Sequence, residues 1–181
     1  MHEKRRLGLV GIYIALGANQ PAQYNGQVCA PAQTFRQALT LLGRDMKIVA
    51  ASNLWQSPAW PDPDAQPPYI NGVMEVDTAH NPLTLLKTLK QAEAAFGRTK
   101  TVRNAPRSLD LDILDYHGQI LHSDVLTLPH PRMLTRPFVL FPLAEIAPDW
   151  RDPKKKRTLQ DWTARLSLNE VVSMQRLGPL L

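Results

Sequence analysis

The order in which helix-type and strand-type patterns follow one another most constrains the fold of this chain. In residues 31–42 and 82–96, apolar side chains recur at spacings of three and four, which predicts helices that bury one face. A proline opens each stretch, and a glycine, Gly43 or Gly97, follows it, as is usual at helix ends. Around them lie four short apolar or alternating segments that favour strands, at residues 9–16, 48–56, 69–78 and 108–116.

The resulting order, β, α, β, β, α, β, is typical of a ferredoxin-like α+β sandwich, which we predict as the core of a single domain over residues 1–181. Beyond it we expect C-terminal helices at residues 137–146 and 159–166. A turn at His117 and Gly118 predicts a short partner strand after 108–116. The basic run 154–157 is interpreted as a solvated turn.

Composition narrows the class of protein. Of the 181 residues, 44% are hydrophobic and 20% are charged, which suits one packed core. No apolar run reaches the roughly 18 residues that a membrane span needs. Cys29 is the only cysteine, so no intrachain disulfide can form, as is usual in a reducing compartment. We expect a cytoplasmic monomer without a membrane partner.

Asp110 and Asp112 give the clearest chemical signal. They alternate with apolar residues in a strand pattern, so both carboxylates face one side, about 6.6 Å apart. Two carboxylates suffice for Mg²⁺ when a nucleotide supplies further oxygen ligands. The alternative is an edge strand with a solvated outer face, but aspartate is depleted in strands.

The stretch 98–107, just before this strand, carries Arg98, Lys100, Arg103 and Arg107 and no acidic residue. It lacks a clear apolar period, which predicts a loop beside the carboxylates. Arginine grips phosphate oxygens in a bidentate fork, so the pairing of a basic loop with an aspartate pair favours a polyphosphate ligand. A merely solvated basic loop is the alternative.

Three further positions are candidates for a site. Glu93 lies on the apolar stripe of its helix, so it either has a polar partner or ligand, or reaches out to water. Tyr69 and Asn71 share a strand face, where a ring could stack on a flat heterocycle and a carboxamide could read its edge. The alternatives are that Tyr69 is core and that Asn71 with Gly72 forms a hairpin turn.

The segment 128–138 contains a histidine between two prolines, His130, followed by Arg132, Arg136 and Phe138. Phosphate contact and a plain surface histidine are both open interpretations. The sequence has no Gly-x-Ser-x-Gly elbow, no P-loop, no Gly-x-Gly-x-x-Gly and no zinc-type spacing. Any chemistry would therefore rest on metal, charge and positioning.

With these residues in view, the chain resembles the 6-hydroxymethyl-7,8-dihydropterin pyrophosphokinase family of folate biosynthesis, over about residues 11–166. The motifs that carry the resemblance are YIALGAN at 13–19, SP at 57–58, QPPYIN at 66–71, ExxxGR at 93–98, APRSLDLDI at 105–113, LPHPR at 128–132 and RxFVLxPLxEIAP at 136–148. The chain departs from patterns seen in other members at Lys100, Asn104, Val125 and Pro131.

The resemblance implies a ferredoxin-like fold and transfer of the diphosphate of ATP to the pterin hydroxymethyl group, with release of AMP. Asp110 and Asp112 would hold two Mg²⁺ ions for an in-line displacement at the β-phosphorus, with catalytic Arg98 and Arg107 meeting the phosphates. The pterin would contact Ser57, Pro58, Trp60, Tyr69, Asn71 and Phe138, and ATP would contact Glu93, Arg98, Arg107, Ile113, Thr127, His130 and Arg136.

Two other classes compete with this interpretation. A ferredoxin-like nucleic-acid-binding module fits a net charge of +5, but the sequence lacks an RNP1-type string of aromatic residues, and paired aspartates repel a phosphate backbone. A two-metal phosphohydrolase would release phosphate or diphosphate into water. We expect small-molecule substrates and no nucleic-acid partner.

Overall fold

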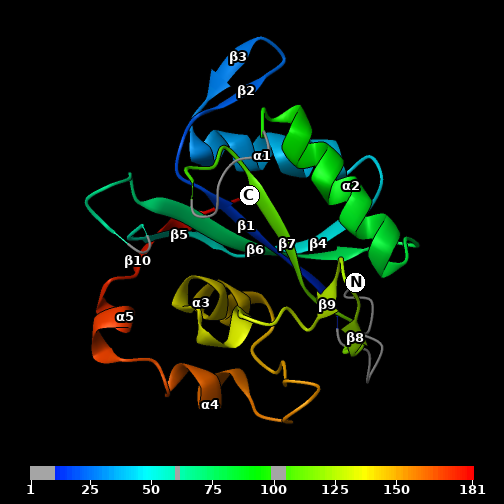
Figure 1. Ribbon diagram of the computed structural model, residues 1–181, viewed down its shortest axis with the longest axis vertical. Coiled ribbons are helices and arrows are strands. Elements are labelled where there is room, and N and C mark those ends of the chain that lie inside the picture. Colours follow the sequence, from blue (N-terminus) through cyan, green and yellow to red (C-terminus); the bar gives the residue numbers. More distant parts are fainter. Residues whose placement is uncertain (1–10, 60–61, 99–104) are drawn as a thin grey trace, which may run out of the picture.

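One antiparallel sheet organises the fold (Figure 1). The computed structural model describes residues 11–59, 62–98 and 105–181. Within these residues the sheet has six strands, in the order β10-β5-β6-β1-β7, with β4 beside β6. The strands are β1 (Ile12–Ala18), β4 (Lys47–Ala51), β5 (Asn53–Ser57), β6 (Tyr69–Asp77), β7 (Asp110–Tyr116) and β10 (Gln175–Pro179).

Two helices cover one face of the sheet (Figure 1). Helix α1 (Pro31–Leu42) and helix α2 (Pro82–Ala95) begin at the predicted prolines. The Asn81 side chain accepts from the backbone N–H of Thr84 and so caps α2. The two helices predicted in this half of the chain are thus confirmed. The apolar side chains of these helices pack on sheet residues of the same face. The helices and the end of α2 contribute Phe35, Leu39, Leu85, Leu89 and Phe96, and the sheet contributes Ile14, Leu16, Met74, Leu111 and Ile113.

Helix α3 (Pro137–Ile146) lies on the opposite face, with the predicted bounds (Figure 1). It packs on Tyr13, Val73 and Leu114, together with Trp150 and Trp162 from the segment that follows it. The sheet is therefore buried on both faces, and the alternation in β1 and β7 separates two cores rather than core from solvent.

The predicted strand 48–56 is interrupted at Ser52. Strands β4 and β5 both pair with β6, on either side of this residue. The Ser52 N–H donates to Val73 O, and its hydroxyl accepts from the Val73 N–H. The hydroxyl thereby replaces a backbone acceptor, and the ladder along β6 continues across the break.

The last part of the chain departs from prediction. The helix expected over 159–166 is only α4 (Leu159–Thr163), because Ser167 opens a second helix, α5 (Leu168–Val172), with its own capping box to Glu170. Strand β10 was not predicted. The basic run forms the expected turn, but Lys155 and Arg157 also lie over the Trp162 ring, at 5.1 and 5.6 Å from its centroid.

Two small hairpins project from the sheet. Strands β2 (Ala22–Tyr24) and β3 (Gln27–Cys29) join through Asn25 and Gly26, both at positive φ, as in a two-residue hairpin turn. The predicted short strand after His117 exists as β8 (Leu121–His122). The prediction of its partner was wrong, because β8 pairs with β9 (Thr127–Leu128) and not with β7.

No helix in the described ranges is long and apolar enough to cross a membrane. A 3-10 turn (Met133–Thr135) connects β9 to α3.

Candidate active site

The two aspartates lie on the face of β7 that is turned toward α3. Leu111 and Ile113, which alternate with them, belong to the core under α1 and α2. Asp110 pairs across the sheet with Gly17, and Asp112 with Ala15, so only small residues stand beside the carboxylates on β1. Side chains two apart on a strand share a face, and both aspartates keep some exposure.

Gly17 leaves a gap between two polar walls. It pairs with Asp110 on one side and with Asn71 of β6 on the other. A Cβ atom at Gly17 would lie 3.9 Å from both Asp110 Cβ and Asn71 Oδ1. A larger side chain at position 17 would separate the Asp110 carboxylate from the Asn71 carboxamide. These two groups lie far apart in the sequence, and the sheet brings them to either side of Gly17.

Both described arginines of the basic loop converge on Asp110. Arg98 Nη1 donates to Asp110 Oδ1 at 2.6 Å, and Arg107 Nη1 donates to Asp110 Oδ2. Burial acts to raise the pKa of Asp110, but the two guanidiniums outweigh it and lower the pKa below its usual value. The carboxylate is therefore ionised at neutral pH. Lys100 and Arg103 lie outside the described residues.

Glu93 is buried, with 2% of its side chain exposed, so the interpretation that it reaches out to water is wrong. Its Oε1 accepts from the Leu111 N–H at 2.7 Å and from Lys90 Nζ at 2.8 Å, and it also contacts Arg98. Burial raises the pKa of Glu93 above its usual value, and Lys90 offsets part of this rise. Glu93 thus links the helix α2 to β7 and to Arg98.

Asn71 lies within the continuous strand β6, so the hairpin-turn alternative is wrong. Its Nδ2 donates to Ser57 Oγ at 3.0 Å and to the backbone oxygen of Trp55 at 3.3 Å. Tyr69 is half-buried and pairs with Ser57 across the strands. Pro58 is exposed directly after Ser57, and Trp60 lies outside the described residues.

His130 stands beside Asp112, with Nε2 3.8 Å from Oδ2. The β7 strand has one extra residue, Leu114, in its pairing with β1, and the Leu114 carbonyl accepts from the His130 N–H at 2.8 Å. His130 Nδ1 accepts from the Arg132 N–H, which leaves Nε2 to carry the proton in the neutral ring. Burial lowers the pKa of His130 below its usual value.

Arg136 and Phe138 flank the start of α3. The Arg136 guanidinium lies 5.4 Å from the Phe138 ring centroid. Among the described residues, no ring contact joins Phe138 to Tyr69. Two rings that hold a third between them would also not touch each other.

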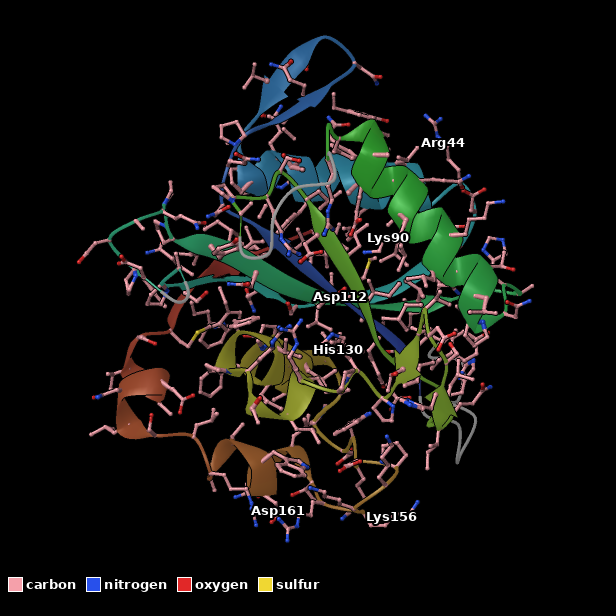
Figure 2. All side chains as sticks on the ribbon, in the orientation of Figure 1. Arg44, Lys90, Asp112, His130, Lys156 and Asp161 are labelled. Carbon is pink, nitrogen blue, oxygen red and sulfur yellow. The ribbon has the colours of Figure 1, made fainter. Side chains whose placement is uncertain are left out.

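A cavity of about 280 Å³ opens beside this cluster, between α2, β7 and the β8–β9 segment. Figure 2 shows Lys90, Asp112 and His130 around the middle of β7. The cavity joins four predicted residues, Asp112, Ile113, Thr127 and His130, to two positions noted above as departures, Val125 and Pro131. It also includes residues that the sequence analysis did not select: Leu86, Lys90, Ser123, Asp124 and Leu126.

Comparison with known proteins identifies the family. The model of the 7,8-dihydro-6-hydroxymethylpterin-pyrophosphokinase (HPPK) family matches residues 13–148, well over half of the chain. The chain belongs to this family. The match includes every described residue of the cluster around Asp110 and Asp112, and it ends before α4, α5 and β10.

Three bacterial relatives in this family carry the name 2-amino-4-hydroxy-6-hydroxymethyldihydropteridine pyrophosphokinase. The Pseudomonas aeruginosa relative is 40% identical over 144 residues, which cover 78% of this chain and 83% of that protein. The Bacillus subtilis relative is 38% identical over 138 residues, covering 74% and 76%. The Synechocystis relative is 44% identical over 114 residues, covering 63% of this chain and 57% of that protein.

A metal site formed by the described residues of this chain would rest on two carboxylates, Asp110 and Asp112. In the described parts of the chain, no group of three or more His, Cys, Asp or Glu side chains could hold a metal ion. A pair of ionised carboxylates fits Mg²⁺, which usually takes one or two from protein and the remaining oxygens from water and phosphates. The donor set of Asp110 and Asp112 is thus compatible with magnesium that arrives with a nucleotide.

Three charged residues near the site, Lys90, Asp115 and Asp124, were not selected from the sequence. Lys90 lies three residues before Glu93 on α2, a spacing that could have signalled the pair. Asp115 is fully buried and accepts from Trp150 Nε1 and from the Gly118 N–H, each at 2.7 Å. No local pattern predicts the burial of Asp115, because its partner Trp150 lies 35 positions later in the sequence, after α3.

Proposed function

We propose that the chain transfers the diphosphate of ATP to the hydroxymethyl group of 6-hydroxymethyl-7,8-dihydropterin and releases AMP, in folate biosynthesis. The observation that carries this is the Asp110 and Asp112 pair: Asp110 binds Arg98 and Arg107, and Asp112 lines the cavity beside His130. The names of the relatives agree with this activity.

We further propose that the core is the ferredoxin-like sandwich predicted from sequence. The order β1, α1, β4 with β5, β6, α2, β7 supports it, as does the arrangement of β5, β6, β1 and β7 across the sheet. Helices α1 and α2 pack on one face of that sheet. On this proposal α3, α4, α5 and β10 are additions to the core.

The pterin would lie beside Asn71, on the face of the sheet that also carries Asp110. The Asn71 carboxamide offers a donor and an acceptor to an amide-like ring edge. The Asn71 Nδ2 group now donates to Ser57 Oγ, and it would donate to the pterin once that bond is broken. Tyr69 and Phe138 would stack on the two faces of the ring. Ser57 and Pro58 would close the pocket from the end of β5, and the pterin contact of Trp60 stays a prediction from the sequence.

ATP would occupy the cavity and extend its phosphates toward Asp110. Ile113, Thr127 and His130 line the cavity together with Asp112, and His130 Nε2 lies 3.8 Å from Asp112 Oδ2. Arg136 supplies a further cation for the triphosphate. Glu93 contacts the Arg98 guanidinium and so helps to position it. Lys90 also lines the cavity and adds a cation at its wall.

Asp110 and Asp112 would hold two Mg²⁺ ions, and the low pKa of Asp110 keeps that carboxylate ionised for this role. When bound, magnesium neutralises the charge on the phosphates and aligns the reacting oxygens. Since Arg98 and Arg107 are now engaged by Asp110, their guanidiniums would turn to the phosphates as the carboxylate takes up metal.

The reaction balances without a covalent enzyme intermediate. The hydroxymethyl oxygen forms a bond to the β-phosphorus, the bond from that phosphorus to the α,β-bridging oxygen breaks, and AMP leaves with the bridging oxygen. The hydroxyl proton is released. The residues of the chain act by positioning both substrates and by neutralising charge.

AMP release from ATP tests the proposal. We expect release that depends on both Mg²⁺ and the hydroxymethyl pterin, together with formation of the pterin diphosphate. Tight RNA binding without turnover would favour a nucleic-acid-binding module instead. Release of phosphate or diphosphate into water without pterin product would favour a phosphohydrolase.

A relative in Pisum sativum is named a mitochondrial bifunctional protein, so a cytoplasmic location stays a prediction.

A further inference from the structure

Asn19 joins two parts of the site that lie far apart in the sequence. It follows β1 directly, and only 4% of it is exposed. Its side-chain oxygen accepts from the Arg107 N–H at 2.8 Å. Its side-chain nitrogen donates to Gln66 Oε1 and to the Pro67 carbonyl, each at 3.2 Å.

We propose that Asn19 is a positioning residue that fixes the separation between Arg107 and the segment leading to Tyr69. This inference rests on the proposed function, because it assigns Arg107 to the phosphate side and Tyr69 to the pterin side of one reaction. One carboxamide would then set the alignment of the two substrates.

The link to Arg107 has two parts. The Asn19 backbone N–H donates to the Arg107 carbonyl at 2.9 Å, in addition to the side-chain bond to the Arg107 N–H. The backbone of Arg107 is therefore held at both of its polar groups, and its guanidinium is directed at Asp110. The Gln20 N–H also donates to the Arg107 carbonyl.

The link to the pterin side enters through Pro67. That carbonyl stands two residues before Tyr69, whose strand also carries Asn71. Because the intervening residue is Pro68, few backbone angles are free between the Asn19 contact and Tyr69.

A turn residue that merely ends a strand bonds to its own neighbours. The side-chain partners of Asn19 instead lie 47, 48 and 88 positions away. Only a neutral carboxamide supplies an acceptor for one partner and donors for the other. An ionised aspartate keeps the acceptor and lacks the donors, so the two links can be separated by substitution.

The test compares Asn19→Asp and Asn19→Ala with two controls at Gln33, an exposed residue of α1. Gln33→Ala removes an exposed carboxamide, and Gln33→Glu adds the same negative charge as Asn19→Asp. Three quantities are measured for each variant: the temperature of unfolding, the pterin Kd with a non-hydrolysable ATP analogue, and kcat for AMP release.

We expect Asn19→Asp to raise the pterin Kd about fivefold or more, the effect of losing hydrogen bonds to a buried group, with a smaller change in kcat. Asn19→Ala should also lower kcat by roughly tenfold, because Arg107 loses its side-chain anchor. Both Gln33 variants should stay within about twofold of wild type, because the side chain of Gln33 is exposed and lies outside the site.

A purely structural role would lower the unfolding temperature of both Asn19 variants while leaving the pterin Kd and kcat of the folded protein within twofold of wild type, and that result would overturn the proposal. Asn19→Asp alone decides the pterin link if Asn19→Ala does not fold. Absence of AMP release from the wild type would instead overturn the proposed function, and the positioning role with it.

Discussion

Asp110 and Asp112 share a face of β7 but have different surroundings. Asp110 holds two arginine side chains, whereas Asp112 is more exposed and has His130 as its nearest basic partner, at 3.8 Å. The first carboxylate binds Arg98 and Arg107, at the two ends of the basic loop. The second faces the cavity, where a nucleotide would meet it.

We predict that Asp110→Ala and Asp112→Ala each lower kcat for AMP release by about 10²-fold or more, because each would lose charge stabilisation at the transferred phosphoryl group. Asp149→Ala, a change of an exposed carboxylate outside the family match, is the control and should have no effect. Near wild-type turnover in both site variants would exclude a metal role for the pair.

Asp115 provides a prediction about pH. Burial raises its pKa, against the hydrogen bond from Trp150. The folded state therefore binds more protons than the unfolded state between the two pKa values, so this group stabilises the fold progressively more as the pH falls through that interval. Above both pKa values, where the carboxylate is ionised in the folded and the unfolded state, this group contributes least.

In Asp115→Asn this contribution is absent. The free energy of unfolding of the wild type minus that of Asp115→Asn should rise as the pH is lowered from 7 to 4, as measured by urea titration at each pH. A difference that stays constant or falls over this range would show that Asp115 does not titrate with a raised pKa.

Helix α2 shows how one element serves both stability and the site. Its first turn is capped by Asn81, its middle turns bury Leu85 and Leu89, and its last turns carry Lys90 and Glu93 to the cavity and to β7. Because Glu93 also contacts Arg98, the position of α2 helps to fix the position of the Arg98 guanidinium.

Asn81→Ala should lower the free energy of unfolding by about 1 kcal/mol, because the Thr84 N–H loses its acceptor. The matched control is Ser167→Ala, which removes the cap of α5, a helix with no buried residue. It should change global stability less, since α5 can fray locally. Equal losses in denaturant titration would contradict this difference between the two helices.

At the scale of the whole molecule, Glu145 ties together parts of the chain that are distant in sequence. From α3, its Oε2 accepts from the Asn53 N–H at 2.6 Å and from Asn53 Nδ2 at 3.0 Å. Its Oε1 accepts from Arg176 Nε of β10 at 2.9 Å. Helix α3 and the edge strand β10 are thereby joined to β5.

Glu145→Ala should lower the free energy of unfolding by about 1 to 3 kcal/mol, since it leaves a partly buried N–H without its charged acceptor. Glu145→Gln keeps an acceptor oxygen and should lose less. Denaturant titration of both variants measures this, and a loss in Glu145→Gln as large as in Glu145→Ala would show that the ion pair with Arg176 dominates.

The sequence by itself determined the elements whose signals are local. Helices α1, α2 and α3 begin at their prolines, and the alternation of Asp110 and Asp112 with leucine and isoleucine put both carboxylates on one face. These features follow from backbone preferences and from the period of each element, which a few neighbouring residues encode.

Only the tertiary structure decided which distant groups meet. The break at Ser52, the pairing of β8 with β9, strand β10, and the contacts of Asn19 and Asp115 all depend on partners many residues away. A hydrogen bond between remote segments leaves no periodic trace in either segment, because its geometry is fixed by how the sheet and helices pack. The residue types of the candidate site were therefore readable in the chain, whereas their alignment was not.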